Sequence, residues 1–367
     1  PLMTTSSAQL LTHEEVDFGV IGEGELTLHQ LIEHTTGDLS GIAGLAWKKN
    51  GEIRHNDPRQ PIACLDELPF LDYSLVPTQV YLDFQQRLEM PPWLFLSTSR
   101  GCPFRCTFCA TPALWPGPVR RLSVPRLFKE MAHHRSRFPD AHFGFMDDSF
   151  FSDKRWLHQF FDAMANFGGR YCCIGRADHL EAGDVTRLAQ TGCHYVALGV
   201  ETGNQNRQKK IRKYLDLRKV ERSVALLIQH GILCKCFFML GFPDETLEEM
   251  VETVNFAVTC ARLGMQECNI FPVSAYPGTE LAHGLDHSVF RSTIYHGHDH
   301  DNRPITEFES SEARSEKRLS IYAAVPDADL NPYVNRQQLL ELIRLAYQKV
   351  ERREDLTLSE IQEIQNR

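Results

Sequence analysis

Between about residues 90 and 275, short apolar segments alternate with amphipathic ones, and this alternation constrains the fold more than any other feature. Six segments have the composition of buried β-strands: "LFLST" (94–98), "HFGFMD" (142–147), "YCCIG" (171–175), "HYVALGV" (194–200), "LCKCFFML" (233–240) and "ECNIFPV" (267–273). Near-continuous apolar strands separated by helices are typical of parallel βαβ units, because helices then cover the sheet. The pattern predicts six such units.

The helices between these strands have their own signals. In residues 217–231, apolar side chains recur every three or four positions. Another helix is predicted to start at Thr246 and to run to about Leu263, because Glu249 three residues later completes a capping box. A further helix is predicted at about 335–351. Six units are fewer than the eight of a full barrel, so we expect an α/β fold with a partial (β/α)6 TIM-like barrel, whose site lies at the carboxyl ends of the strands.

The flanking regions differ from this core, which we place at 91–282. Residues 1–66 hold one strand, one helix and a β-meander with an Asn50-Gly51 turn, and we expect them to be the remnant of a larger domain. Residues 67–90 are expected to be a linker, and 283–367 a C-terminal extension of a loop and helices. Residue 1 is proline and not methionine, so we expect a fragment or a processed chain.

Composition excludes several classes of protein. The 367 residues are 42% hydrophobic and carry a net charge of −9, which gives no broad attraction for nucleic acid or an anionic membrane. No apolar run approaches the ~18 residues of a membrane span, and no signal peptide begins the chain. The 11 cysteines are an odd number and suggest a reducing compartment. We therefore expect a cytoplasmic protein with neither a membrane nor a nucleic acid as partner.

Three cysteines stand close together in "SRGCPFRCTFCATP", at Cys102, Cys106 and Cys109, with C-x3-C-x2-C spacing. A closed structural zinc site takes four ligands. Electron-transfer clusters also generally use four cysteines. A [4Fe–4S] cluster on three cysteines leaves one iron open for a substrate or cofactor. A zinc loop and simple buried thiols are the remaining alternatives.

This motif, with Phe108 before its last cysteine and a strand just before it, resembles that of the radical S-adenosylmethionine (SAM) enzymes. The resemblance covers roughly residues 90–280. It implies that Cys102, Cys106 and Cys109 hold a [4Fe–4S] cluster, and that the amino and carboxylate groups of SAM bind the open iron. One-electron reduction of SAM would give methionine and a 5′-deoxyadenosyl radical, which takes a hydrogen atom from a small-molecule substrate. An electron donor such as flavodoxin or ferredoxin is implied as a partner.

The resemblance also implies SAM contacts at the strand ends. Asp147 and Asp148 follow the second strand, where a carboxylate would bind the SAM ammonium; a solvated helix-capping loop is the alternative. Arg176 follows the third strand and would pair with the SAM carboxylate; a salt bridge to Asp178 is the alternative.

Two later strand ends complete the predicted set, to which Phe108 also belongs. Glu201 resembles the acid that binds the ribose or amino group, and Gly199 would let the backbone approach the ligand. An exposed cap is the alternative for Glu201. Gly241 shapes a turn, and Met239 would pack near adenine. The alternative for this segment is a strand–turn–helix connection that binds no ligand.

Other conspicuous residues receive a structural interpretation. Arg120 and Arg121 could meet an anionic substrate, but solvated surface residues are the favoured interpretation. The same holds for His296, His298 and His300, which we interpret as part of a polar loop and not as metal ligands.

The N-terminal 66 residues resemble the end of the Rossmann-like cobalamin-binding domain that is fused to one group of radical SAM enzymes. The D-x-H-x-x-G motif of such domains is absent, so no residue is assigned to cobalt and cobalamin stays an open cofactor. The resemblance implies methylation of an unactivated carbon or phosphorus centre. Radical rearrangement, oxidation or cyclisation is the alternative within the family, and a non-catalytic iron–sulfur protein or inactive fragment is the alternative outside it.

Overall fold

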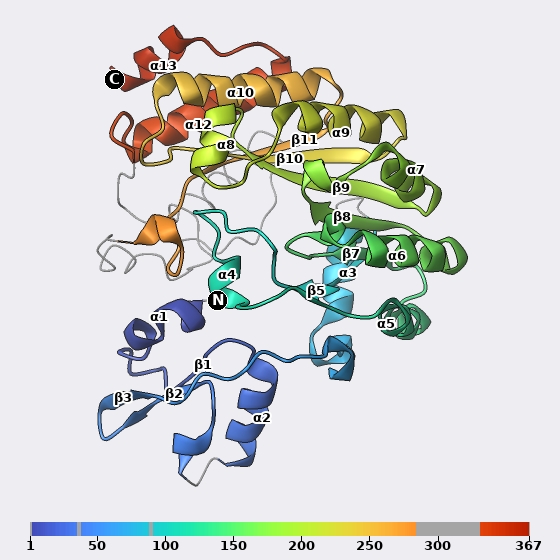
Figure 1. Ribbon diagram of the computed structural model, residues 1–367, viewed down its shortest axis with the longest axis vertical. Helices are drawn as coiled ribbons and strands as arrows, with labels where there is room; N and C mark the ends of the chain where they lie inside the picture. Colours follow the sequence, from blue (N-terminus) through green and yellow to red (C-terminus); the bar gives the residue numbers. More distant parts are fainter. Residues whose placement is uncertain (1, 35–37, 88–90, 284–330, 367) are drawn as a thin grey trace.

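The computed structural model describes residues 2–34, 38–87, 91–283 and 331–366. Figure 1 shows a large α/β part and, at one end of it, a smaller N-terminal unit. The predicted loop at 283–316, apart from His283, and the three histidines at 296, 298 and 300 lie outside the described residues. In the described ranges, no helix is long and apolar enough to cross a membrane.

The large part is built on one six-stranded sheet in the order β11-β10-β9-β8-β7-β4, with every neighbouring pair parallel. Its strands are β4 (Trp93–Leu96), β7 (His142–Phe145), β8 (Tyr171–Gly175), β9 (Cys193–Glu201), β10 (Leu233–Leu240) and β11 (Glu267–Pro272). All six predicted strands are confirmed to within a few residues. The order follows the sequence, as expected of a partial barrel of consecutive βα units, and the fold class is confirmed.

Helices lie along the outer side of this sheet (Figure 1). They are α5 (Val124–Arg137), α6 (Lys154–Phe167), α7 (Ala182–Gln190), α9 (Leu217–Gln229), α10 (Leu247–Arg262), α12 (Arg336–Arg352) and α13 (Leu358–Gln365). The three predicted helices are thus confirmed. The capping box at the start of α10 is formed, since the Glu249 N–H donates to the Thr246 hydroxyl and the Thr246 N–H donates to the Glu249 carboxylate.

Alternation along the strands assigns the two faces of the sheet. On β10, Cys234, Cys236 and Phe238 are fully buried among the outer helices, whereas Lys235 and Phe237 between them are only partly buried. Successive side chains of a strand point to opposite faces. The outer face therefore carries the main core, and the inner face is more open.

The N-terminal unit contains α1 (Leu2–Leu10), β1 (Phe18–Val20), α2 (Gly24–Glu33), β2 (Leu45–Lys49) and β3 (Glu52–His55). Its sheet is antiparallel in the order β1-β2-β3. The predicted hairpin turn is present, with φ of 53° at Asn50 and 81° at Gly51, as a two-residue type I′ loop requires. Helix α1 was not anticipated.

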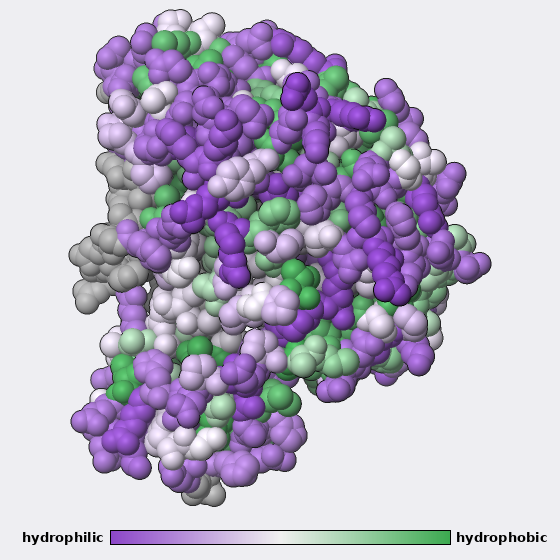
Figure 2. Space-filling model, viewed as in Figure 1, coloured by the Kyte–Doolittle hydropathy of each residue, from purple (hydrophilic) through white to green (hydrophobic). Residues whose placement is uncertain are grey.

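Several short elements complete the chain and carry little sequence signal. They are β5 (Ser99–Arg100), β6 (Arg120–Arg121), α4 (Thr111–Leu114), α8 (Gln205–Lys210), and the 3₁₀ turns η1 (Leu39–Gly41), η2 (Leu65–Glu67), η3 (Tyr73–Leu75), η4 (Phe150–Ser152), η5 (Ala177–His179) and η6 (Glu280–Ala282). The segment 67–90 was expected to be a linker, yet it contains α3 (Thr78–Arg87). Figure 2 shows the surface on this side as mainly hydrophilic, with apolar residues in small separate areas.

Candidate functional site

The three cysteines lie on one loop between β5 and α4, beyond the carboxyl end of β4. All three thiols are free and half-buried. The N–H of Cys109 donates to the carbonyl of Cys106 at 3.1 Å and closes a tight turn. The intervening Thr107 is held on both sides, because its N–H donates to the carbonyl of Ile211 and its carbonyl accepts from Leu281, each at 3.1 Å. The loop is therefore fixed to two distant parts of the chain.

The surroundings of these thiols fit an iron–sulfur cluster. Burial raises the pKa of Cys106 to about 11 and also raises the pKa of Cys102, and the cation of Lys213 opposes the shift at Cys106. Coordination to iron removes those protons, and the cations of Lys213 and Arg176 would offset the charge that results. Among the described residues, no three His, Cys, Asp or Glu side chains are arranged around a single ion. Cysteines that bind different irons of one cube do not have to converge in that way.

Asp147 and Asp148 occupy different environments. Asp147 is only 3% exposed, and its Oδ1 accepts hydrogen bonds from the hydroxyls of Thr98, at 2.9 Å, and Ser99. Asp148 stays open to solvent on one side and accepts a hydrogen bond from the Thr111 hydroxyl at 3.0 Å. Burial raises the pKa of both carboxyls. Asp147 thus joins the segment after β7 to the segment after β4. Asp148 is the carboxylate that a ligand can reach.

Arg176 follows β8 and is 6% exposed. Its Nε and Nη2 donate to the two carboxylate oxygens of Asp178 at 3.0 and 2.8 Å, so the alternative that the sequence left open is confirmed. Nη2 also donates to the carbonyl of Lys213 at 2.8 Å. The guanidinium carbon lies 3.8 Å from the ring centroid of Phe104, in the cysteine loop. Arg176 therefore joins the cysteine loop to the segment after α8.

Lys213 was not predicted, because it belongs to no motif. Its Nζ lies 2.8 Å from Oε1 of Glu201, and both side chains are nearly buried. Glu201 at the end of β9 has φ of 72°, and the neighbours of Lys213, Arg212 and Tyr214, have φ of 53° and 55°. Left-handed backbone at non-glycine residues is strained and tends to occur at functional sites. This strained pair is a candidate part of the site.

Only glycine fits at position 199 beside the Glu201–Lys213 ion pair. A Cβ at Gly199 would lie 2.7 Å from Oε1 of Glu201 and 3.0 Å from Nζ of Lys213. The missing side chain therefore makes room for Glu201 and Lys213. Its predicted role in the approach of a ligand stays a prediction.

The turn after β10 is the remaining predicted position. Gly241 has φ of +90°, and a Cβ there would lie 2.6 Å from Cδ2 of Leu339. The buried carboxylate of Glu245 accepts the N–H groups of Gly241, at 2.6 Å, and Phe242, at 3.1 Å. Phe242 in turn packs with Phe108 and Met239 in one apolar cluster, and the Phe108 and Phe242 ring centroids lie 6.2 Å apart. The residue before the last cysteine thus contacts the β10 turn directly.

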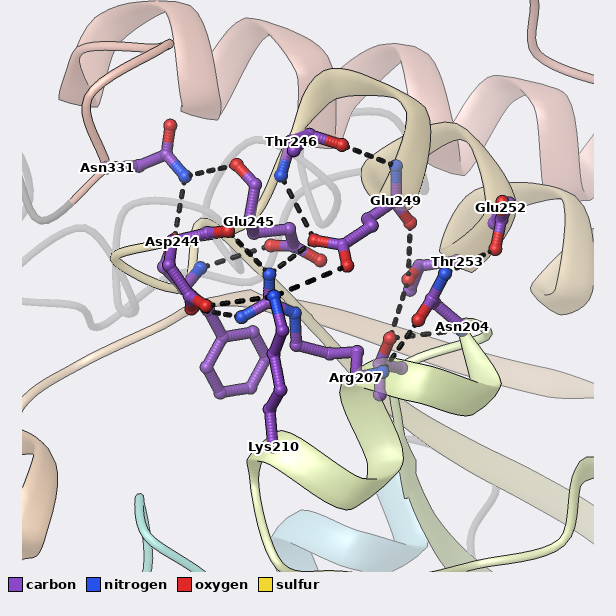
Figure 3. A network of polar contacts seen from close by, with 12 residues as sticks. Asn204, Arg207, Lys210, Asp244, Glu245, Thr246, Glu249, Glu252, Thr253 and Asn331 are labelled. Carbon is purple, nitrogen blue, oxygen red and sulfur yellow. Dashed lines mark hydrogen bonds and ion pairs between the residues drawn. The ribbon is translucent and has the colours of Figure 1, made fainter.

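A polar network fixes this turn to α8 and α10 (Figure 3). The Arg207 side chain is 1% exposed and is paired with Asp244 and Glu249. Its Nη2 also donates to the Asp244 carbonyl at 2.6 Å. Asn331 donates to the carbonyls of Phe242, at 2.7 Å, and Glu245, at 2.8 Å. The segment that leads from α8 to Ile211 and Lys213 is therefore held by the buried guanidinium of Arg207 and its two carboxylate partners.

The interpretation of Arg120 and Arg121 as solvated surface residues was wrong. Arg120 pairs with Glu23 and donates to the carbonyl of Ile62 at 2.7 Å. Arg121 donates to the carbonyl of Ser149 at 2.7 Å, and its guanidinium carbon lies 5.0 Å from the ring centroid of Trp156. Both side chains are thus engaged inside the protein, and their contact with an anionic substrate stays a prediction.

Comparisons with known proteins agree with this geometry. Residues 96–257 match the family model of the radical SAM superfamily. An uncharacterized methyltransferase of Pyrococcus horikoshii, PH0819, is 29% identical over 270 residues, which cover 72% of this chain and 57% of that protein. The cytidylyl-2-hydroxyethylphosphonate methyltransferase of Streptomyces wedmorensis is 26% identical over 313 residues, which cover 74% of this chain and 57% of that protein. The chain thus spans a little over half the length of these relatives.

A solved structure shares the fold. The radical SAM methyltransferase TsrM of Kitasatospora setae, with tryptophan and a SAM analogue bound, superposes with a TM-score of 0.65 at 16% identity, over 96% of this chain and 78% of that one.

Proposed function

Residues 96–257 match the family model of the radical SAM superfamily, and on this premise we propose that the chain belongs to it, binds a [4Fe–4S] cluster and SAM, and methylates an unactivated carbon or phosphorus centre of a small molecule. The observation that carries the proposal is the cysteine loop, which Ile211 and Leu281 hold at Thr107 and whose Phe104 contacts Arg176, close to the Lys213–Glu201 pair. The cluster, when bound, would supply the electron that cleaves one SAM to methionine and a 5′-deoxyadenosyl radical. The methyl group would come from a second SAM, because the first keeps its methyl group in the methionine.

The residues of the chain have distinct tasks in this proposal. Cys102, Cys106 and Cys109 are the iron ligands. Asp148 binds the SAM ammonium, because it is the more accessible carboxylate at the end of β7. Asp147 is a positioning residue.

The remaining predicted residues complete the SAM site. Arg176 and Lys213 offer positive charge to the SAM carboxylate, and Glu201 accepts hydrogen bonds from its ribose or amino group. Gly199 leaves space for the Glu201–Lys213 pair. Gly241, Met239 and Phe108 shape the apolar side of the site near adenine.

Two partners belong to the proposal in different ways. An electron donor such as flavodoxin or ferredoxin would reduce the cluster. For cobalamin, the described part of the N-terminal unit offers no residue that we can assign to cobalt, so we derive no step through it. The methyltransferase names of the two relatives support methylation as the reaction.

The test is anaerobic reconstitution with iron and sulfide, reduction with dithionite, addition of SAM, and mass spectrometry for 5′-deoxyadenosine. We expect 5′-deoxyadenosine from the wild type and from Cys64→Ala, whose thiol is exposed and lies outside the motif, and none from Cys106→Ala. Equal amounts from wild type and Cys106→Ala would contradict the proposal.

A second measurement follows the methyl group. Isotope-labelled SAM would be incubated with candidate substrates, with and without added methylcobalamin. A labelled methyl group in the product supports methyl transfer. Formation of 5′-deoxyadenosine with a changed but unmethylated product would instead support rearrangement, oxidation or cyclisation.

A further inference from the structure

The inner face of the six-stranded sheet has a composition that the proposed reaction does not explain. Phe95 on β4 is 47% exposed and Met146, directly after β7, is 50% exposed, although both belong to the central sheet. Their strand neighbours Leu94 and Leu96 are buried in the core on the opposite face. Exposed large apolar side chains in such a place mark a binding surface.

The strand register extends this surface across the sheet. Phe95 is paired with Gly144, and Met239 with Phe271, and residues in register on neighbouring strands point to the same face. Phe237 lies two positions before Met239, on the same face. Phe237, Met239 and Phe271 are all partly buried. Aromatic and thioether side chains therefore lie on the inner face towards both edges of the sheet, at β4 and β7 on one side and at β10 and β11 on the other.

The aromatic rings present flat surfaces. A Cβ at Gly144 would lie 2.5 Å from Cδ1 of Phe95, so the Phe95 ring lies against the backbone of β7, which only glycine permits. Towards the other edge of the sheet, on the same face, the rings of Phe237 and Phe271 are stacked, with centroids 6.0 Å apart and planes inclined by 27°. Rings arranged in this way favour stacking with a flat partner.

The cations named on this face are paired with carboxylates. Lys235 lies 3.1 Å from the carboxylate of Glu267, to which the Tyr195 hydroxyl also donates at 3.1 Å. At the carboxyl end of the strands, Arg176 is paired with Asp178 and Lys213 with Glu201. Among the residues that the structure describes, these three cations each have a carboxylate partner, and Arg176 and Lys213 are already assigned to SAM. Asp148 adds an accessible negative charge at the same edge. A phosphate ester would demand cations that are not already paired.

We propose that the substrate is a largely apolar molecule with a flat aromatic or conjugated ring system, which lies along the inner face between Phe95 and the Phe237–Phe271 pair. This substrate class rests on the proposed function. The proposed reaction requires the reacting end of the substrate to lie near Met146 and Met239. Met239 packs in the same apolar cluster as Phe108 of the cysteine loop, so the surface is continuous with the candidate site. An anionic nucleotide is the excluded class.

The test uses Nile red, a neutral flat dye, as the probe, titrated by fluorescence against the full reconstituted chain. We expect saturable binding that weakens at least tenfold in Phe95→Ala and in Phe237→Ala. Tyr81→Ala, an aromatic residue of α3 that is 61% exposed, should change the affinity less than twofold. Thermal melting of each variant shows whether it is folded, and Phe95→Leu keeps the test informative if Phe95→Ala unfolds, because it should bind the dye more weakly than the wild type.

Cytidine monophosphate is the competitor that represents the excluded class. We expect millimolar nucleotide to leave dye binding unchanged. Displacement of the dye by the nucleotide, or dye affinity within twofold of the wild type in both phenylalanine variants, would overturn the inference. The formation of 5′-deoxyadenosine by the wild type is measured separately without substrate. Failure of that reaction counts against the proposed function, and failure of dye binding counts against the substrate class alone.

Discussion

The two sheets of this protein are stabilised in different ways. The parallel sheet is packed against its helices through one continuous apolar core that includes Phe143, Phe145 and Phe160, all fully buried. The core of the N-terminal sheet consists of five residues, Leu31, Leu39, Ile42, Leu45 and Trp47. Because small units bury too little apolar surface to be stable alone, the N-terminal unit needs further contacts.

Ion pairs to the larger part supply those contacts. Glu23 pairs with Arg100, at 2.6 Å, and with Arg120, at 2.5 Å, and Glu25 also pairs with Arg100. Arg100 and Arg120 belong to β5 and β6, on either side of the cysteine loop. The comparison teaches that the barrel is stable through its own core, whereas the N-terminal unit depends on docking, and that its docking surface adjoins the candidate site.

The largest effect is expected in the barrel core. Phe160→Ala removes a ring that contacts Phe145, Phe150, Trp156 and Tyr171, and should lower the free energy of unfolding by ~4 kcal/mol. Denaturation followed by circular dichroism checks this. Leu75→Ala, at a side chain that is 83% exposed, is the control and should change stability by less than ~0.5 kcal/mol. A loss below ~1 kcal/mol for Phe160→Ala would mean that the core is not what stabilises the barrel.

The docking surface comes next. Glu23→Gln leaves the nearly buried Arg120 without its ion-pair partner and Arg100 with Glu25 alone, and should cost ~3 kcal/mol of docking. Hydrogen exchange should become faster in 16–33 and 45–55 and stay slow in 194–200 and 233–240. Glu52→Gln, whose ion pair is exposed, serves as the control and should leave exchange unchanged. Equal acceleration in both regions would show that the two parts unfold as one unit.

An effect of intermediate size is expected from Glu245, which lies in the turn after β10 and should make stability depend on pH. Burial raises the pKa of Glu245 from its ordinary 4.5 to about 7, so between these values the folded state holds a proton that the unfolded state releases. Stability from this group is complete below pH 4.5 and is lost as the pH rises through about 7. Over that range the wild type should lose ~2 kcal/mol relative to Glu245→Gln. Parallel melting curves for the two proteins from pH 5 to 8 would refute this assignment.

The smallest effect concerns the two aspartates after β7. Asp148→Asn should weaken SAM binding by about tenfold, ~1.4 kcal/mol, because it removes the accessible carboxylate, while stability changes little. Asp147→Asn should instead alter the melting temperature, because Asp147 joins Thr98 and Ser99. Calorimetric SAM titration and thermal melting of both variants decide the matter. The reverse assignment of the two effects would place Asp147 in the site.

The sequence predicted the barrel well for a physical reason. Strands buried on the outer face, such as β8 and β10, are almost entirely apolar, and α10 begins with a capping box, so local patterns sufficed. The missed elements are those without local patterns. β5 and β6 have two residues each, and α8 has six, so they owe their structure to tertiary contacts.

The same distinction applies to the site. The spacing of the cysteines was informative by itself. Lys213 was missed because its role depends on a partner twelve positions away, Glu201, and on left-handed backbone at its neighbours. Which of Asp147 and Asp148 is accessible also depends on tertiary contacts, with Thr98, Ser99 and Thr111, which no local pattern encodes.

The most direct test of the account is the EPR spectrum of the reconstituted, dithionite-reduced protein, recorded with and without SAM. A cluster held by Cys102, Cys106 and Cys109 leaves one iron open, so SAM should shift the g values of the reduced cluster. Cys64→Ala should show the same shift. A reduced cluster whose spectrum is identical with and without SAM would contradict the central claim and favour an iron–sulfur protein that does not use SAM.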